Sequence, residues 1–196
     1  MSERAPTVER SEAIPALVDR RLAGARAALE SLHAARAQVA EVVAALSRTV
    51  RGGGLVATCG NGGSAAEALH LAEELIGRYR GNRAPHRSVC LNADPTALTC
   101  IANDFGFEQV FARQCQALLS SGDALVVFST SGASMNLVAA LRTARERGAT
   151  TIGLLGRDGG ACAPLCDHAL IVPLADSGHV QEAHQVVMHA MCEAVE

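Results

Sequence analysis

The stretch LVATCGNGGSAAEALHLAEELIGRYR, residues 55–80, decides the fold. It begins with an apolar run of strand length and continues through glycine-rich GNGGS into a segment with apolar residues at helical spacing. A strand, a tight turn and a helix in this order form the basic unit of a parallel α/β sheet. Such sheets bind ligands beyond the carboxyl ends of their strands, so we expect a functional loop at residues 60–64.

The rest of the chain repeats this alternation. Strands are expected at 55–59, 88–92, 124–129, 150–156 and 168–174, and helices at 64–77, 95–120, 134–148 and 178–195. Strands that are apolar on both faces and alternate with helices predict an α/β fold: a doubly wound parallel five-stranded sheet with helices on both faces. Residues 8–51, rich in Ala, Leu, Arg and Glu, predict two helices or one long broken helix. We therefore divide the chain into an N-terminal helical extension at 1–52 and a single α/β unit at 53–196.

Composition excludes several function classes. The chain has 196 residues and a net charge of −3, and all its basic residues are Arg, which argues against a nucleic-acid footprint and excludes any lysine-based chemistry. No apolar run reaches the roughly 18 residues of a membrane span, and the charged N-terminus lacks a signal-peptide core, so we expect a cytoplasmic protein. The seven cysteines lack C-x-x-C spacing and are expected to be reduced, mostly buried thiols.

The loop FSTSGASMN, residues 128–136, follows an apolar strand and precedes a helix. Hydroxyl groups together with free backbone N–H groups at a helix N-terminus bind a phosphate dianion without lysine. The alternative is an ordinary helix cap, for which one hydroxyl suffices. The abundance of hydroxyls favours an anion site at Ser129, Thr130, Ser131 and Ser134.

The glycine loop also matches the dinucleotide pattern G-x-G-x-x-A, which is weak evidence by itself. A dinucleotide site expects an acidic residue about 20 residues further on, but Asp94 lies well beyond that spacing. The better interpretation is a loop that contacts the hydroxyls of a sugar through Asn61, Gly62, Gly63 and Ser64.

His70 and Glu74 are four residues apart, so they project from one face of the helix after this loop. A solvated surface pair is the alternative, and the nearby glycine loop raises the functional interpretation to equal standing. In the C-terminal helix, Gln181 and His189 lie about 12 Å apart along the axis and about 80° around it, so both fit one cavity. Between them, His184 is predicted to be a packing histidine with satisfied hydrogen bonds.

These segments together resemble a known family. The chain is similar to the bacterial phosphoheptose isomerases, members of the sugar-isomerase (SIS) fold group, in the blocks CGNGGSAAEALHLAEELIGRYR, IANDFGFEQVFARQ, FSTSGASMN, GRDGG and VQEAHQVVMH. The resemblance implies conversion of D-sedoheptulose 7-phosphate to D-glycero-D-manno-heptose 7-phosphate through an enediol, as the first step of nucleotide-activated heptose synthesis. It also implies a homotetramer with active sites at subunit interfaces, a phosphosugar-binding domain at 53–196 and N-terminal helices that contribute to oligomer packing.

The resemblance assigns site residues in this chain. Glu74 is the implied base and His189 the implied acid. One Zn²⁺ per subunit is implied at His70, Glu74, Gln181 and His189. The implied substrate contacts are Asn61, Gly62, Gly63, Ser64, Arg78, Asn103, Asp104, Ser129, Thr130, Ser131, Ser134 and Gln181. Ala133 and the segment ADSGHVQ, residues 175–181, depart from the family's common pattern.

Two other functions compete with the enzyme. One is a non-catalytic SIS protein that binds the replication initiator, and the other is a phosphosugar-sensing module. Sensing modules usually accompany a DNA-binding module, and none fits this sequence. Retention of both Glu74 and His189 favours the enzyme over the initiator-binding relatives. Whether zinc acts in catalysis or only orients the site is left open, because a carboxylate bound to zinc is a weaker base.

Overall fold

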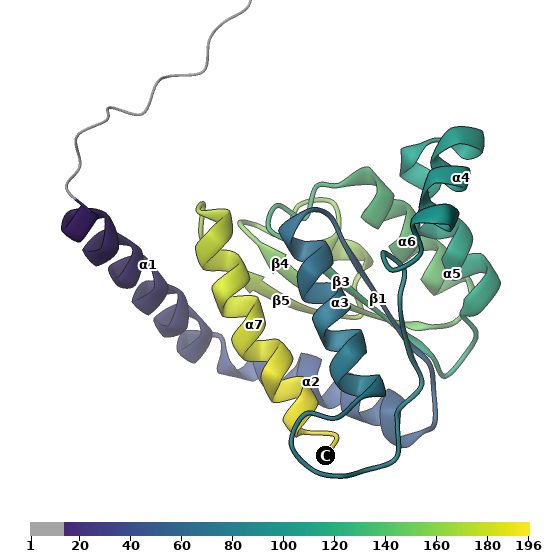
Figure 1. The fold of residues 1–196 in the computed structure, drawn as a ribbon, viewed down its shortest axis with the longest axis horizontal. Coiled ribbons are helices and arrows are strands. Elements are labelled where there is room, and N and C mark those ends of the chain that lie inside the picture. The colour runs from purple at the N-terminus through teal and green to yellow at the C-terminus, as the bar shows by residue number, and fades with distance from the viewer. Residues whose placement is uncertain (1–13) are drawn as a thin grey trace, which may run out of the picture.

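The computed structural model describes residues 14–196, so the part of the N-terminal helical prediction before residue 14 lies outside the described residues. Two helices come first, α1 (Ile14–Ala34) and α2 (Arg36–Arg51), as one of the two expected forms of this region. Pro15 lies in the first turn of α1, where its missing N–H costs no hydrogen bond. The N-terminal end of α1 extends away from the body of the protein (Figure 1), whereas α2 packs against the sheet.

Five parallel strands form one sheet in the order β2-β1-β3-β4-β5. This arrangement confirms the predicted doubly wound sheet. The strands are β1 (Val56–Gly60), β2 (Ser88–Cys90), β3 (Ala124–Ser129), β4 (Thr150–Gly156) and β5 (His168–Val172). Because β2 and β3 lie on opposite sides of β1, the loops that leave β1 and β3 border the topological switch point of the sheet.

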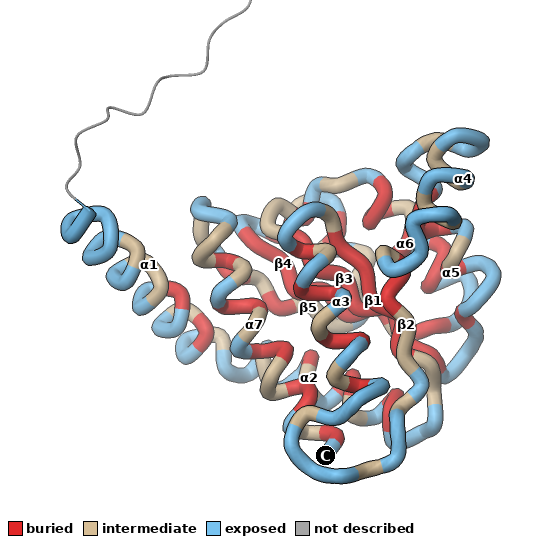
Figure 2. The backbone as a smooth tube through the Cα atoms, viewed as in Figure 1, coloured by how far each residue is buried: buried red, intermediate tan, exposed pale blue. Residues whose placement is uncertain are grey.

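Helices cover both faces of the sheet. On one face, α2, α3 (Gly63–Ile76) and α7 (Ser177–Glu193) pack against Val126 and Phe128 of β3. On the other face, α5 (Ala112–Leu118) and α6 (Met135–Glu146) pack against Leu125 and Val127 of the same strand. The inner strands β1, β3 and β4 are therefore buried from both sides and red in Figure 2, whereas the edge strands β2 and β5 are partly half-buried.

The single helix predicted at 95–120 is wrong. The segment forms α4 (Pro95–Phe105), a short 3-10 turn η1 (Phe107–Gln109) and α5. Gly106 separates them with φ of 87°, a left-handed backbone conformation that ends a right-handed helix. The carboxylate of Asp94 caps α4 by accepting hydrogen bonds from the N–H groups of Thr96 and Ala97. Another short 3-10 turn, η2 (Ala163–Leu165), precedes β5.

All seven cysteines are free thiols. As expected, most are buried: Cys100 is exposed, Cys166 is half-buried, and the other five lie in the interior. None of the helices within residues 14–196 is long and apolar enough to cross a membrane.

Candidate active site

Two asparagines that sequence reasoning missed fix the glycine loop. The side-chain amides of Asn61 and Asn136 donate to each other's oxygen at 2.9 Å, which joins the loop after β1 to the start of α6. The amide of Asn92, just after β2, accepts from Gly60 N–H at 3.1 Å and donates to Gly60 C=O at 2.9 Å. The sequence carried a signal for both residues: Asn92 comes just after a predicted strand, and Asn136 lies at the start of a predicted helix.

The hydroxyl-rich loop borders a small polar cavity. Ser134 precedes α6 without a side-chain hydrogen bond to the helix, so it does not act as the ordinary cap. The hydroxyls of Ser129 and Ser131 accept hydrogen bonds from Gly132 and Ala133 N–H at 3.0 and 3.3 Å. The cavity has a volume of about 90 Å³, and its lining comes from three separate parts of the chain: Asn61, Ser64, Phe128, Ser129, Thr130, Ser131, Ser134 and Gln181.

A second group of side chains lies further along α3 and α7. It consists of His70 and Glu74 on α3 and His189 on α7. His70 Nε2 is 3.3 Å from Glu74 Oε1 within α3. The His189 ring of α7 meets the His70 ring edge to face, with ring centroids 5.5 Å apart. The structure thus places the expected base and the expected acid on facing helices.

Helices α3 and α7 run side by side and in the same direction (Figure 1). Near the start of α3, a Cβ atom on Gly63 would lie 2.4 Å from Nε2 of Gln181, so the glycine allows close approach. Further along both helices His70 faces His189. Gln181 therefore lies at the polar cavity, and His189 lies beside the His70–Glu74 pair.

Two of the four implied zinc ligands, His70 and Glu74, are spaced as ligands of one metal ion are. Two ligand atoms bound tetrahedrally to Zn²⁺ at about 2.0–2.1 Å are about 3.3–3.4 Å apart. The 3.3 Å separation of His70 Nε2 and Glu74 Oε1 matches that spacing. Glu73, which sequence reasoning did not select, has a carboxylate oxygen within 4.8 Å of the ligand atoms of the other two. Its position next to Glu74 was the available signal.

Three expected substrate contacts lie apart from this constellation. Arg78 is exposed in the loop after α3. Asn103 and Asp104 are exposed on α4, where the Asn103 amide donates to the neighbouring Asp104 carboxylate at 2.8 Å. Within residues 14–196, none of the three hydrogen bonds to the His70–Glu74 pair or to the hydroxyl-rich loop.

His184 differs in part from its prediction. It is fully buried and packs edge-on against Phe128, with ring centroids 6.2 Å apart. Its expected hydrogen bonds are missing, since neither ring nitrogen has a partner among the described residues. The nearest charged group is Glu67, a buried acid that sequence reasoning missed although it lies three residues before His70.

Comparison with known proteins agrees with this architecture. The SIS domain family matches residues 22–156. A phosphoheptose isomerase from Solidesulfovibrio magneticus is 47% identical, with 86% of each chain covered. One from a Bradyrhizobium species is 42% identical over 95% of this chain and 96% of its own. The solved phosphoheptose isomerase structure from Neisseria gonorrhoeae superposes with a TM-score of 0.87 at 36% identity, covering 93% of this chain and 98% of that one. The relatives, the sheet order and the two loops that follow β1 and β3 agree: the chain belongs to the phosphoheptose isomerases of the SIS family.

Proposed function

We propose that this protein converts D-sedoheptulose 7-phosphate to D-glycero-D-manno-heptose 7-phosphate, the first step of nucleotide-activated heptose synthesis. The observation that carries the proposal is the meeting of His70 and Glu74 on α3 with His189 on α7, beside a polar cavity. An aldose–ketose isomerase needs a base and an acid on either side of two neighbouring substrate carbons, next to a phosphate site.

Substrate binding is assigned to the two loops. The phosphate lies against Ser129, Thr130, Ser131 and Ser134, where uncapped N–H groups of α6 supply partial positive charge. Asn61, Gly62, Gly63 and Ser64 contact the sugar, and Gln181 reaches the cavity from α7. This division leaves the far end of the substrate's carbon chain pointing toward the His70–Glu74 pair.

The reaction follows from the acid and base. The Glu74 carboxylate removes a proton from C1 while His189 donates a proton to the C2 carbonyl oxygen, which gives the enediol. His189 then takes the proton from the C1 hydroxyl as the C1 carbonyl forms, and Glu74 returns its proton to C2. Each positioned group of this kind contributes typically 10²–10⁴-fold in rate.

Zinc is part of the proposal. His70, Glu74, Gln181 and His189 would hold one Zn²⁺ per subunit, and the His70–Glu74 spacing supports the first two of these ligands. When bound, the ion polarises substrate oxygens as a Lewis acid. The residues themselves orient the sugar and move its protons.

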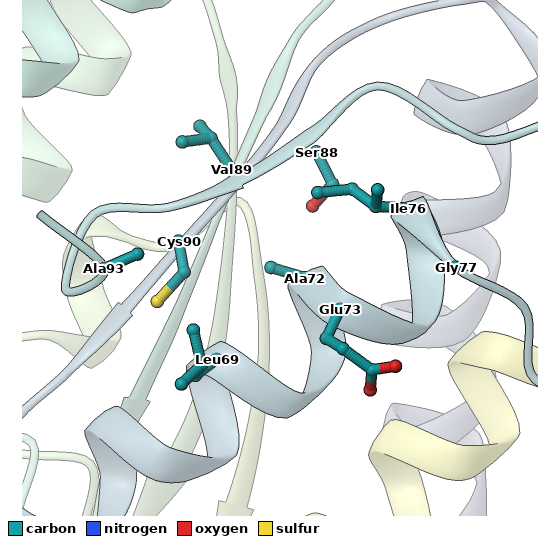
Figure 3. A pocket seen from close by; sticks show the side chains of 9 residues that line it. All are labelled: Leu69, Ala72, Glu73, Ile76, Gly77, Ser88, Val89, Cys90 and Ala93. Carbon is teal, nitrogen blue, oxygen red and sulfur yellow. The ribbon is translucent and has the colours of Figure 1, made fainter.

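We also propose a homotetramer in which neighbouring copies complete the active sites. Helix α1 exposes an apolar series along its length: Ile14, Leu17, Val18, Leu22 and Leu29. Beside the sheet edge, an apolar pocket of about 440 Å³ lies between α3 and β2, lined in part by Leu69, Ile76 and Val89 (Figure 3). Burial of both surfaces by second copies of this chain explains their apolar character.

The same assembly allows the exposed Asn103, Asp104 and Arg78 to act in a neighbour's site. In this proposal residues 1–52 serve oligomer packing, and the cytoplasmic location stays a prediction.

The experiment incubates purified protein with D-sedoheptulose 7-phosphate and follows the aldose by NMR. Wild-type protein is expected to form the aldose, and Glu74→Gln is expected to lose at least 100-fold in kcat. Glu146→Gln, which changes an exposed acid at the end of α6, serves as the matched control and keeps full activity. Normal turnover by Glu74→Gln would reject the base assignment, and no turnover by the wild type would favour a binding function instead.

Light scattering of the eluting protein measures the oligomeric state. A mass near four times 20.3 kDa is expected. Leu22→Glu places a charge on the exposed face of α1 and is expected to dissociate the assembly. A monomeric wild type would contradict the tetramer.

A further inference from the structure

Tyr79 lies directly against the ring of His189. The two rings are stacked, with centroids 5.6 Å apart and an interplanar angle of 23°. The His70 ring is nearly perpendicular to the same imidazole, at an interplanar angle of 82°. The His189 ring therefore lies between two other rings, and one of them, Tyr79, comes from neither α3 nor α7.

Tyr79 belongs to the loop that joins α3 to β2, and this loop is tied to both helices. On the α3 side, the Arg83 guanidinium donates to the carbonyl oxygens of Glu74 and Leu75 at 2.8 and 3.1 Å. On the α7 side, Arg80 donates to the Glu193 carboxylate at 2.7 Å, and its guanidinium lies 4.9 Å from the centroid of the Tyr79 ring. These contacts attach the loop to both helices, so the position of Tyr79 depends on how α3 and α7 lie relative to each other.

The side chain of Glu196 binds the backbone of the same loop. Its carboxylate accepts a hydrogen bond from Gly81 N–H. That bond, with further N–H groups of Arg80 and Tyr79, holds the pKa of the Glu196 carboxyl below its ordinary value. The hydrogen bond from Gly81 N–H restricts the backbone two residues after Tyr79.

We propose that Tyr79 is a positioning residue that sets the orientation of the His189 ring, and that the Glu196 carboxylate holds Tyr79 against it. The inference rests on the proposed function, in which His189 moves protons between substrate oxygens. An imidazole that turns freely about its side-chain bonds spends less time in the productive orientation, so loss of the stack lowers kcat and leaves substrate binding nearly unchanged.

The kinetic test separates ring stacking from the phenol hydroxyl. Tyr79→Leu is expected to lower kcat roughly 3- to 10-fold with KM within about 2-fold, as fits the strength of an aromatic pair. Tyr79→Phe keeps the ring and is expected to keep kcat within about 2-fold of the wild type. Glu196→Ala is expected to lower kcat by a smaller factor, and to add nothing further in the Tyr79→Leu background, because both changes act on one contact.

Glu146→Gln, which changes an exposed acid at the end of α6, is the matched control for Glu196→Ala. It leaves every contact of the Tyr79 loop in place, and its expected effect on kcat is negligible. Equal losses in Tyr79→Leu and Tyr79→Phe would overturn the proposal, because the hydroxyl would then matter rather than the ring. Unchanged kcat in Tyr79→Leu would overturn it as well.

A second readout does not depend on activity. The protein is prepared without metal and labelled with ¹³C at the histidine Cε1, and the His189 signal is assigned by its loss in His189→Gln. Because of the ring current of Tyr79, this signal is expected to lie upfield of its position without the stacked ring. It should move downfield in Tyr79→Leu and stay in place in Tyr79→Phe. An unmoved signal in Tyr79→Leu would reject the stack. If the signal moves but the wild type forms no aldose, the stack stands and the proposed function fails.

Discussion

Glu67 on α3 and His184 on α7 face each other in the interior, with Glu67 Oε1 3.8 Å from His184 Nδ1. Both residues are almost completely buried, at 3% and 0% exposure. Neither carboxylate oxygen and neither ring nitrogen has a hydrogen-bond partner among residues 14–196. The attraction between these two side chains is therefore the nearest interaction that offsets the cost of burying them. The pair spans the interface between α3 and α7, the two helices that carry the catalytic side chains.

Removing one member of this pair is expected to be costly. Glu67→Leu leaves His184 buried without a partner and should lower the free energy of unfolding by roughly 3 kcal/mol, as for other broken buried pairs. The double variant Glu67→Leu/His184→Leu fills the space with apolar groups and should recover most of that loss. Urea unfolding at one protein concentration measures both. A double variant that loses as much as the two single variants combined would show that the residues do not interact.

Gly63→Ala is expected to impair substrate binding more than stability. The added Cβ would lie 2.4 Å from Gln181 Nε2, and that flexible side chain is able to move away. Alanine also favours the helix by up to about 1 kcal/mol relative to glycine. Because the displaced Gln181 lines the polar cavity, KM for the phosphosugar should rise about 10-fold while the melting temperature stays within a few degrees. An unchanged KM would show that the contact has no role in binding.

Asp123 is expected to make stability depend on acid pH. Although burial opposes its ionisation, hydrogen bonds from Leu55 N–H at 2.7 Å and from the Ser120 N–H and hydroxyl hold its pKa below the ordinary value. A lowered pKa in the folded state stabilises the protein above the unfolded-state pKa of about 3.9, and this contribution disappears as pH falls through the folded value.

Asp123→Asn should therefore lose roughly 1.5–3 kcal/mol at pH 7, the usual value for hydrogen bonds to a charged group. The difference from the wild type should hold at pH 5 and shrink below about pH 4. Urea unfolding at several pH values checks it, with exposed Asp19→Asn as the control. A difference that grows toward low pH would contradict the sign.

Thiol labelling is expected to be selective for Cys100, the exposed cysteine. Burial raises the pKa of Cys115, Cys166 and Cys192 to about 12 and that of Cys162 to about 11, so these thiols stay protonated and unreactive. Burial also raises the pKa of Cys59.

Iodoacetamide at pH 7.5, followed by mass spectrometry, should add one label to the folded protein and seven after unfolding. Cys100→Ser should remove the rapid label and serves as the control. Several labels added at one rate to folded protein would contradict the burial of these thiols.

The sequence by itself determined the succession of strands and helices, because the hydrophobic period of a segment is a local property. It also indicated that functional loops follow β1 and β3, since parallel strands present their carboxyl ends at one edge. The break of the 95–120 helix was within reach of the sequence, because Gly106 is a local signal that the apolar pattern around it concealed.

Only the tertiary structure decided which distant side chains meet. No local pattern relates His70 to His189, Gly63 to Gln181 or Glu67 to His184, because these contacts depend on how α3 and α7 lie on the sheet. The same holds for Tyr79, which lies between the predicted helix at 64–77 and the predicted strand at 88–92 yet stacks on His189. Packing of helices on a shared sheet face brings residues more than a hundred positions apart into contact, and that packing is settled by the whole core rather than by any one segment.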